Sequence, residues 1–510
     1  MDKDKNYKKV SPDIDVNIEY LEGLFKDCGD IVKRKIPVGV DKDNFIYVMY
    51  IDDMTDRDTI EDRVIQTLMV EIRKTPPSKN NLKENLFKEL VDGGVTTADI
   101  SEDDDLDNAC TEILSGNTLL LIDGYSKCIV ISTKGFANRG VSEAQTEVVV
   151  QGSKEAFSES FRINTVLIRR RIRDTKLKIE QIKVGRRSKT DVGIVYIDDI
   201  VRPEILKEAK KRINEIDIDA ILDSGYIEQF IEDDYLSPFP QMQLTERPDK
   251  AASALLEGRI VIIVDNTPFV IILPVVLASF YQSSEDYYQR WEIMSFVRII
   301  RYISGIFAVA LPGLYIAIVA YHPTMLPTQL LFKIAQSRAS VPIPAVFEVI
   351  LMELAFETLR EAGIRLPSAI GSTLGIVGGI IIGQATVDAG LVSPIVVIII
   401  ALTGLCSFSI PNISLVSGYR LMKYVIIFFS AILGLFGFWL SIMLILIHLV
   451  NLKSFGIPFM FPFTSSEENT SDIKDTFFRM PIFKMKKRPI FANPKQKIRM
   501  NVDKTTVRRK

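Results

Sequence analysis

The sequence has 510 residues, a formal net charge of −2 and 47% hydrophobic residues. This length allows two or three folding units, and the near-balanced charge excludes a global attraction to nucleic acid or to anionic membranes. The four cysteines have no paired spacing, and each of the two histidines adjoins an apolar run. This pattern argues against a disulfide framework and predicts neither a metal site nor a cofactor.

Residues 1–140 predict a small α/β module. Its helical and extended patterns alternate, with helices expected at 17–28, 59–72 and 106–114 and strands expected at 45–52, 118–123 and 128–133. The acidic run SEDDDLD at 101–107 is expected to start the third helix, because carboxylates stabilise helix N-termini. Cation binding by this run is the alternative.

Residues 141–257 predict a second small α/β module. Its expected elements are helices at 155–172 and 203–216, strands at 177–185 and 190–198, and a proline-bearing connector at 236–248. A basic cluster ends the first of these helices and consists of Arg169, Arg170, Arg171 and Arg173. It is either the solvated face of an amphipathic helix or a contact for lipid phosphates or an acidic partner.

Residues 258–450 predict an α-helical polytopic membrane domain. Four stretches are long and uncharged enough to cross roughly 30 Å of hydrocarbon; they are 302–321, 366–387, 388–420 and 424–447. Two further segments, 258–274 and 345–359, are marginal. The first reads as two strands about an Asp265–Asn266 turn, and the second as an amphipathic or re-entrant helix.

Charge sets the expected orientation. The start of the chain is charged and lacks the apolar core of a signal peptide. The tail at 451–510 holds 14 Lys and Arg against 5 acidic residues, which marks it as cytoplasmic. With both ends on the cytoplasmic side the number of crossings is even, so we expect four, with six as the alternative.

A glycine ladder marks the second predicted span. Glycines recur every four residues along one helix face, a pattern that lets another backbone approach closely; they are Gly371, Gly375, Gly379 and Gly383, with Gly378 beside them. Gln384 and Asp388 follow and could supply oxygen ligands to a cation. Ordinary helix packing and a plain helix-end residue are the alternatives.

Two acidic residues, Glu353 and Glu357, share one face of the predicted helix at 345–359. An ion pair with Arg360 on the same helix is one interpretation. The other is a vestibule whose carboxylates attract cations.

Three stretches together resemble the A subunit of the nutrient germinant receptors of endospore-forming bacteria. They are the run EVVVQGSKEAFSESFRINTVLIRRRI and its continuation to residue 200, then GRIVIIVDNTPFVIILP with SSEDYYQRW, and finally SAIGSTLGIVGGIIIGQATVDAGLVSP. The likeness covers roughly residues 140–450. It implies a protein of the spore inner membrane that works with a permease-like, nutrient-binding B subunit and a lipoprotein C subunit.

The resemblance also implies that the chain oligomerises into a nutrient-gated channel for monovalent cations. No Walker loop, nucleophile elbow or kinase motif is present in the sequence, so we do not expect an enzyme. A non-conducting membrane scaffold and a solute transporter with a cytoplasmic regulatory domain remain the alternatives.

Overall fold

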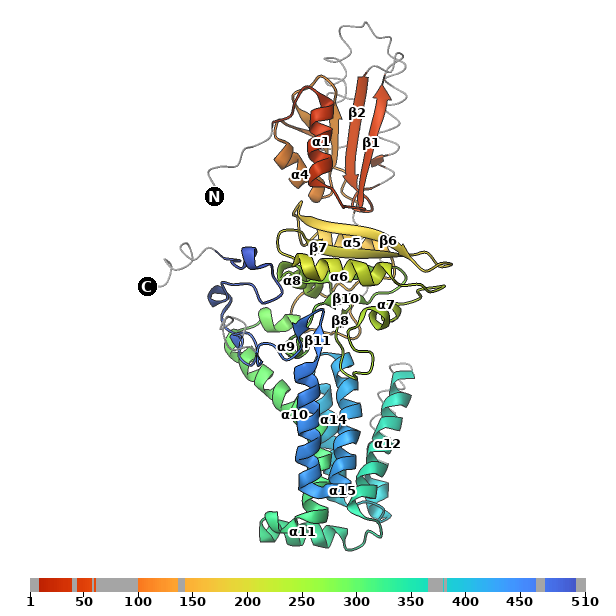
Figure 1. Cartoon of the computed structure of the whole chain (residues 1–510), viewed down its shortest axis with the longest axis vertical. Coiled ribbons are helices and arrows are strands. Elements are labelled where there is room, and N and C mark those ends of the chain that lie inside the picture. The colour runs from red at the N-terminus through yellow and green to blue at the C-terminus, as the bar shows by residue number, and fades with distance from the viewer. Residues whose placement is uncertain are drawn as a thin grey trace, which may run out of the picture. The chain divides into compact units, whose positions relative to one another are not determined.

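The computed structural model describes residues 9–38, 44–56, 59–60, 100–135, 143–365, 379, 383–464 and 473–500. The chain forms two compact units (Figure 1). Unit 1 comprises Met1–Glu232, Leu244–Pro274 and Lys486–Lys510, and unit 2 comprises Asp233–Gln243 and Val275–Met485. Neither unit is one continuous stretch of chain.

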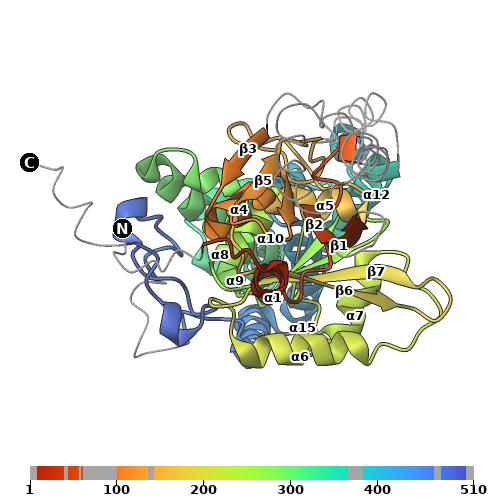
Figure 2. The same cartoon turned by 90° about the horizontal axis from the view of Figure 1, so that it is seen from above.

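The first sheet of unit 1 is antiparallel, with strand order β1-β2-β4-β5-β3. Its strands are β1 (Ile31–Val38), β2 (Asn44–Ile51), β3 (Ile100–Asp103), β4 (Thr118–Ile122) and β5 (Cys128–Ile131). Helices α1 (Ile14–Leu24) and α4 (Leu106–Leu114) cover one face (Figures 1 and 2). The carboxylate of Asp105 accepts the N–H of Asp107 and caps α4, so the end of the acidic run starts this helix as predicted. Residues 101–103 of the run belong instead to β3.

The second sheet of unit 1 has the order β6-β7-β9-β10-β8. Its strands are β6 (Leu177–Val184), β7 (Thr190–Ile197), β8 (Gln243–Thr245), β9 (Ile260–Val264) and β10 (Val270–Leu273). Helices α5 (Phe161–Arg169) and α8 (Pro248–Leu256) bury one face. On the other face α6 (Pro203–Asn214) places Lys210 2.6 Å from Glu180 of β6. A further short helix of this unit is α7 (Ser224–Ile231).

Strands β9 and β10 confirm the prediction of two strands in 258–274. They pair antiparallel and are buried throughout, and Asn266 takes a left-handed conformation in the turn between them. The sequence had placed this segment at the start of the membrane domain. Because it completes the second sheet, it belongs to unit 1.

The C-terminal tail reaches into the core of unit 1 at Gly258. A Cβ on this glycine would lie 2.7 Å from the Cα of Ala492, and its φ of +90° is left-handed. We expect Gly258→Ala to lower the free energy of unfolding by roughly 1–3 kcal/mol, measured by thermal unfolding of the full chain. Gly225→Ala is the matched control, because among the described atoms its Cβ would meet only Oδ1 of Asp223, at 4.0 Å. Equal unfolding of the two variants would contradict the close approach.

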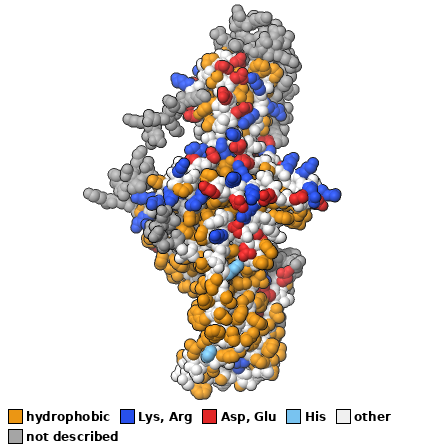
Figure 3. Space-filling model, in the orientation of Figure 1, with side chains coloured by type: hydrophobic (Ala, Val, Ile, Leu, Met, Phe, Trp, Pro, Cys, Tyr) orange, Lys and Arg blue, Asp and Glu red, His pale blue; other side chains and the backbone are white. Residues whose placement is uncertain are grey.

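Unit 2 is helical. Its helices are α9 (Leu277–Tyr281), α10 (Trp291–Tyr321), α11 (Thr328–Arg338), α12 (Ala345–Arg365), α14 (Pro394–Phe408) and α15 (Ile413–Asn451). Helices α10 and α15 pack closely, since a Cβ on Gly313 would lie 2.6 Å from Ile426. On the face shown in Figure 3 hydrophobic side chains cover this unit, whereas charged side chains gather over unit 1.

Among the described residues, α10 and α15 are the helices long and apolar enough to cross a membrane, and α14 is apolar but shorter. The predicted spans 302–321 and 424–447 fall inside α10 and α15. The expected broken span at 388–420 contains α14 and the first turns of α15. Most of 366–387 lies outside the described residues.

Candidate functional site: charged pairs among the apolar helices

Helix α12 directs buried glutamates at neighbouring helices. Glu348 and Glu353 are both 0% exposed. A buried carboxylate among apolar helices is costly unless a cation or several N–H groups surround it. The partners of these side chains therefore define what this part of the molecule can do.

Glu353 pairs with Lys423 of α15. The Lys423 Nζ lies 2.5 Å from Glu353 Oε2 and 4.0 Å from Glu357 Oε1, and the side chains of Lys423 and Glu353 are buried. The other oxygen of Glu353 has no hydrogen-bond donor among the residues that the structure describes. The pair thus holds two opposite charges between α12 and α15.

Glu357 extends this pair into a network. Arg420 of α15 donates from Nε to Glu357 Oε1 at 3.1 Å, and its Nη2 contacts the second oxygen. Arg360 lies 3.9 Å from the same carboxylate, so the pair predicted within α12 is present. Arg360 also donates to Ser407 of α14 at 3.3 Å. The network joins three helices.

Glu348 joins two further elements. Its Oε2 accepts the backbone N–H of Ser393, at the start of α14, at 2.8 Å. Its Oε1 lies 3.1 Å from Nε of Arg338, at the end of α11. Sequence analysis did not find this contact, because neither partner has a spacing that marks it.

In this arrangement the two vestibule candidates are electrically compensated. Three cationic groups, from Arg360, Arg420 and Lys423, surround the carboxylates of Glu353 and Glu357. The carboxylates therefore offer no net negative charge to a passing cation in this arrangement. They could do so only after α12 and α15 separate or slide.

The described part of the glycine ladder, Gly379 and Gly383, makes little contact with the other described residues. A Cβ on Gly379 would meet no described atom within 4 Å, and one on Gly383 would meet only Val397, at 3.6 Å. Gln384 and Asp388 are exposed. Gly371, Gly375 and Gly378 lie outside the described residues. Close packing at Gly379 or Gly383 would therefore need atoms beyond those of the described residues.

The four arginines at the end of α5 do not form one surface. Arg169 is 0% exposed, and its Nε and Nη2 donate to the Asp30 carboxylate at 2.7 and 3.0 Å. Its Nη1 donates to the carbonyl oxygen of Leu177 at 3.0 Å, so all three nitrogens are engaged within the chain rather than with a lipid or a partner, which corrects that prediction for this residue. Arg170 and Arg171 contact Glu155 and, against the effect of burial, hold the pKa of its carboxyl below the usual value. Arg173 is exposed.

Comparison with known proteins identifies the class to which these two units belong. Residues 19–491 match the family described as Bacillus/Clostridium GerA spore germination protein. The chain therefore belongs to the GerA family of spore germination proteins.

Individual relatives are similar to this chain over most of their own length. The chain is 40% identical to spore germination protein KA of Bacillus subtilis over 97% of this chain and 89% of that protein. It is 39% identical to the uncharacterized membrane protein YfkQ of the same organism, over 96% and 93%. The crystallised N-terminal domain of the A subunit of the Bacillus megaterium germinant receptor GerK3 aligns with 54% of this chain and 99% of that domain, at 34% identity and a TM-score of 0.42.

Proposed function

We propose that this chain is a germinant receptor subunit that oligomerises into a nutrient-gated channel for monovalent cations in the spore inner membrane. Nutrient binds to a permease-like partner, and a lipoprotein completes the receptor. Membership of the GerA family, a relative named as a membrane protein and two helices long enough to cross a membrane support this proposal.

The observation that carries the channel proposal is the buried charge network between α12 and α15. Ionisable side chains within a membrane domain are rare, and they commonly mark ion or substrate pathways. Glu353 and Glu357 lie against Lys423 and Arg420 in the arrangement described here. We assign this arrangement to the closed state, in which the side chains of Lys423 and Arg420 neutralise the two carboxylates.

When the channel opens, permeant cations replace the lysine and arginine side chains beside the carboxylates. Nutrient binding to the partner shifts the population toward a state in which α12 and α15 separate. The freed carboxylates attract permeant cations. Gln384 and Asp388, exposed in the single chain, supply further oxygens where the glycine-bearing helices of several copies meet.

Potassium efflux from proteoliposomes that contain this chain with its co-purified membrane partners tests the proposal. We expect nutrient to trigger efflux, Glu353→Gln with Glu357→Gln to lower it, and Gly379→Leu to change gating or assembly. Gly363→Leu is the matched control, because a Cβ there also meets no described atom within 4 Å and the residue lies outside the ladder. An intact, nutrient-binding complex without efflux would refute the channel and favour a non-conducting scaffold.

A further inference from the structure

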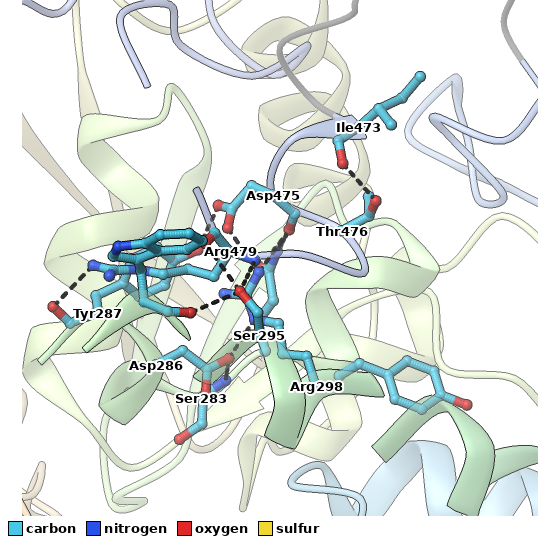
Figure 4. Close-up of polar contacts among 12 residues, drawn as sticks. Ser283, Asp286, Tyr287, Ser295, Arg298, Ile473, Asp475, Thr476 and Arg479 are labelled. Carbon is cyan, nitrogen blue, oxygen red and sulfur yellow. Dashed lines mark hydrogen bonds and ion pairs between the residues drawn. The ribbon is translucent and has the colours of Figure 1, made fainter. Parts of the chain in front are cut away.

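A second cluster of buried charges lies in unit 2, where the C-terminal tail meets the first turns of α10 (Figure 4). Arg298 of α10 is 0% exposed. Its Nε donates to Asp286 at 2.7 Å, and its Nη1 donates to Asp475 of the tail at 2.7 Å. Asp286 also accepts from Arg301 at 2.8 Å. Both carboxylates of the cluster are thus committed to arginines.

Arg479 brings a third guanidinium from the tail. Its side chain is 4% exposed, and its backbone N–H donates to Ser295 of α10 at 3.1 Å. Its Nη2 donates to the carbonyl oxygen of Tyr287 at 3.4 Å. The guanidinium carbons of Arg298 and Arg479 lie 5.5 and 5.7 Å from the centroid of the Tyr287 ring. Tyr287 therefore contacts the guanidinium groups of both arginines.

The cluster has more positive charge and more donors than its own acceptors satisfy. Arg298 and Arg301 face the two carboxylates of Asp286 and Asp475, whereas Arg479 pairs with no carboxylate among the described residues. Nη2 of Arg298 and Nε of Arg479 are buried and find no acceptor among the described residues. An unsatisfied buried donor on a charged group is unfavourable, so an anion that accepts from both would stabilise this site.

The surroundings indicate what kind of anion fits. Exposed aromatic side chains flank the arginines: Trp291 begins α10, and Phe477 and Phe478 belong to the tail. Phe477 packs on Tyr302, one helical turn beyond Arg298, with ring centroids 4.7 Å apart. Buried arginines beside exposed aromatic groups, at the start of a helix long enough to cross a membrane, match a phosphate head group with acyl chains.

We propose that this cluster binds the phosphate group of an anionic phospholipid. Arg298 and Arg479 donate to the phosphate oxygens, and Trp291, Phe477 and Phe478 contact the acyl chains. The lipid joins the tail to α10 and compensates the excess positive charge. The proposal rests on the membrane location in the proposed function but is independent of ion conduction.

Native mass spectrometry of the purified, delipidated full chain tests this site without any flux measurement. Phosphatidylglycerol, phosphatidylcholine and inorganic phosphate are added in separate arms. We expect saturable binding of phosphatidylglycerol and much weaker binding of the other two. Arg479→Gln should weaken phosphatidylglycerol binding about tenfold, the equivalent of losing about 1.4 kcal/mol. Lys484→Gln, which removes the same charge from an exposed position of the tail, should change nothing.

Each remaining outcome also decides the question. Equal phosphatidylglycerol binding by Arg479→Gln and the unmodified chain would overturn the site. Inorganic phosphate that displaces the lipid would keep the arginine site and overturn the lipid as its occupant. Phe478→Ser changes an exposed side chain and so decides the matter if Arg479→Gln fails to fold. It should weaken lipid binding, and unchanged binding would count against the acyl-chain contact.

Discussion

Lys423→Met is expected to lower the free energy of unfolding of the helical unit by roughly 3–5 kcal/mol, the usual cost of breaking a buried ion pair from one side. Methionine keeps the length of the side chain but removes its charge. Glu353 then retains a buried carboxylate whose Oε2 has lost its partner at 2.5 Å. Thermal unfolding of the purified full chain in detergent would report the loss.

A double variant and an exposed lysine serve as controls for this prediction. Glu353→Gln with Lys423→Met removes both charges and should recover most of the lost stability, because neither side then leaves an uncompensated charge. Lys453→Met, at an exposed position just after α15, should change the free energy of unfolding by less than about 0.5 kcal/mol. A Lys423→Met protein that unfolds like the unmodified chain would show that the pair is hydrated.

Asp30→Ala is expected to destabilise unit 1 by a comparable amount, roughly 3–5 kcal/mol. It leaves the Arg169 guanidinium buried, with the carbonyl oxygen of Leu177 as an acceptor at 3.0 Å. Asp30 precedes the first sheet of unit 1, and Arg169 lies in a helix that covers the second. Both sheets should therefore become less stable. Hydrogen exchange of the full chain would locate it, with faster exchange expected in β6 and in the turn around Asp30.

Two variants separate charge from packing at this position. Arg169→Met with Asp30→Leu should recover much of the stability, because apolar groups of similar volume often replace a buried ion pair without loss. Arg173→Ala changes an exposed arginine of the same cluster and should leave exchange in β6 unchanged. If Arg173→Ala were as damaging as Asp30→Ala, the distinction between buried and exposed arginines would be wrong.

Local patterns predicted most of the strands of unit 1. The run FIYVMYID is apolar on both faces, and β2 is indeed buried on both faces, by Tyr47, Met49 and Ile51 on one and by Ile46 and Val48 on the other. Such runs identify strands wherever they lie, because the information is contained within a few residues. The predictions for β4, β5, β6 and β7 are confirmed for the same reason.

The predicted helix at 155–172 started too early. Helix α5 begins at Phe161, because the Asn164 side chain accepts the N–H of Ser158 at 2.8 Å and donates to its carbonyl oxygen at 2.6 Å. These bonds hold the residues before the helix in a loop. Helical periodicity continues through them in the sequence and gave no sign of this competing bonding.

The charge pairs could be predicted only within one helix. The spacing of Glu357 and Arg360 indicated their contact, whereas the span predicted at 424–447 leaves Lys423 outside it. Helix α15 continues through Lys423 because Glu353 compensates its charge. These partners are 70 residues apart, and Arg169 and Asp30 are 139 apart. The sequence shows that burying such a charge would be unfavourable, but it does not show which distant residue compensates the charge.

The order in which the chain is synthesised determines when the discontinuous unit 1 can be completed. Domains generally fold as units while synthesis proceeds from the N-terminus. Every strand of both sheets precedes Trp291, where the first long apolar helix starts. The two sheets can therefore form before that helix is made. Ala492 follows all the apolar helices in the chain, so its docking beside Gly258 completes the core of unit 1 only after those helices have been made.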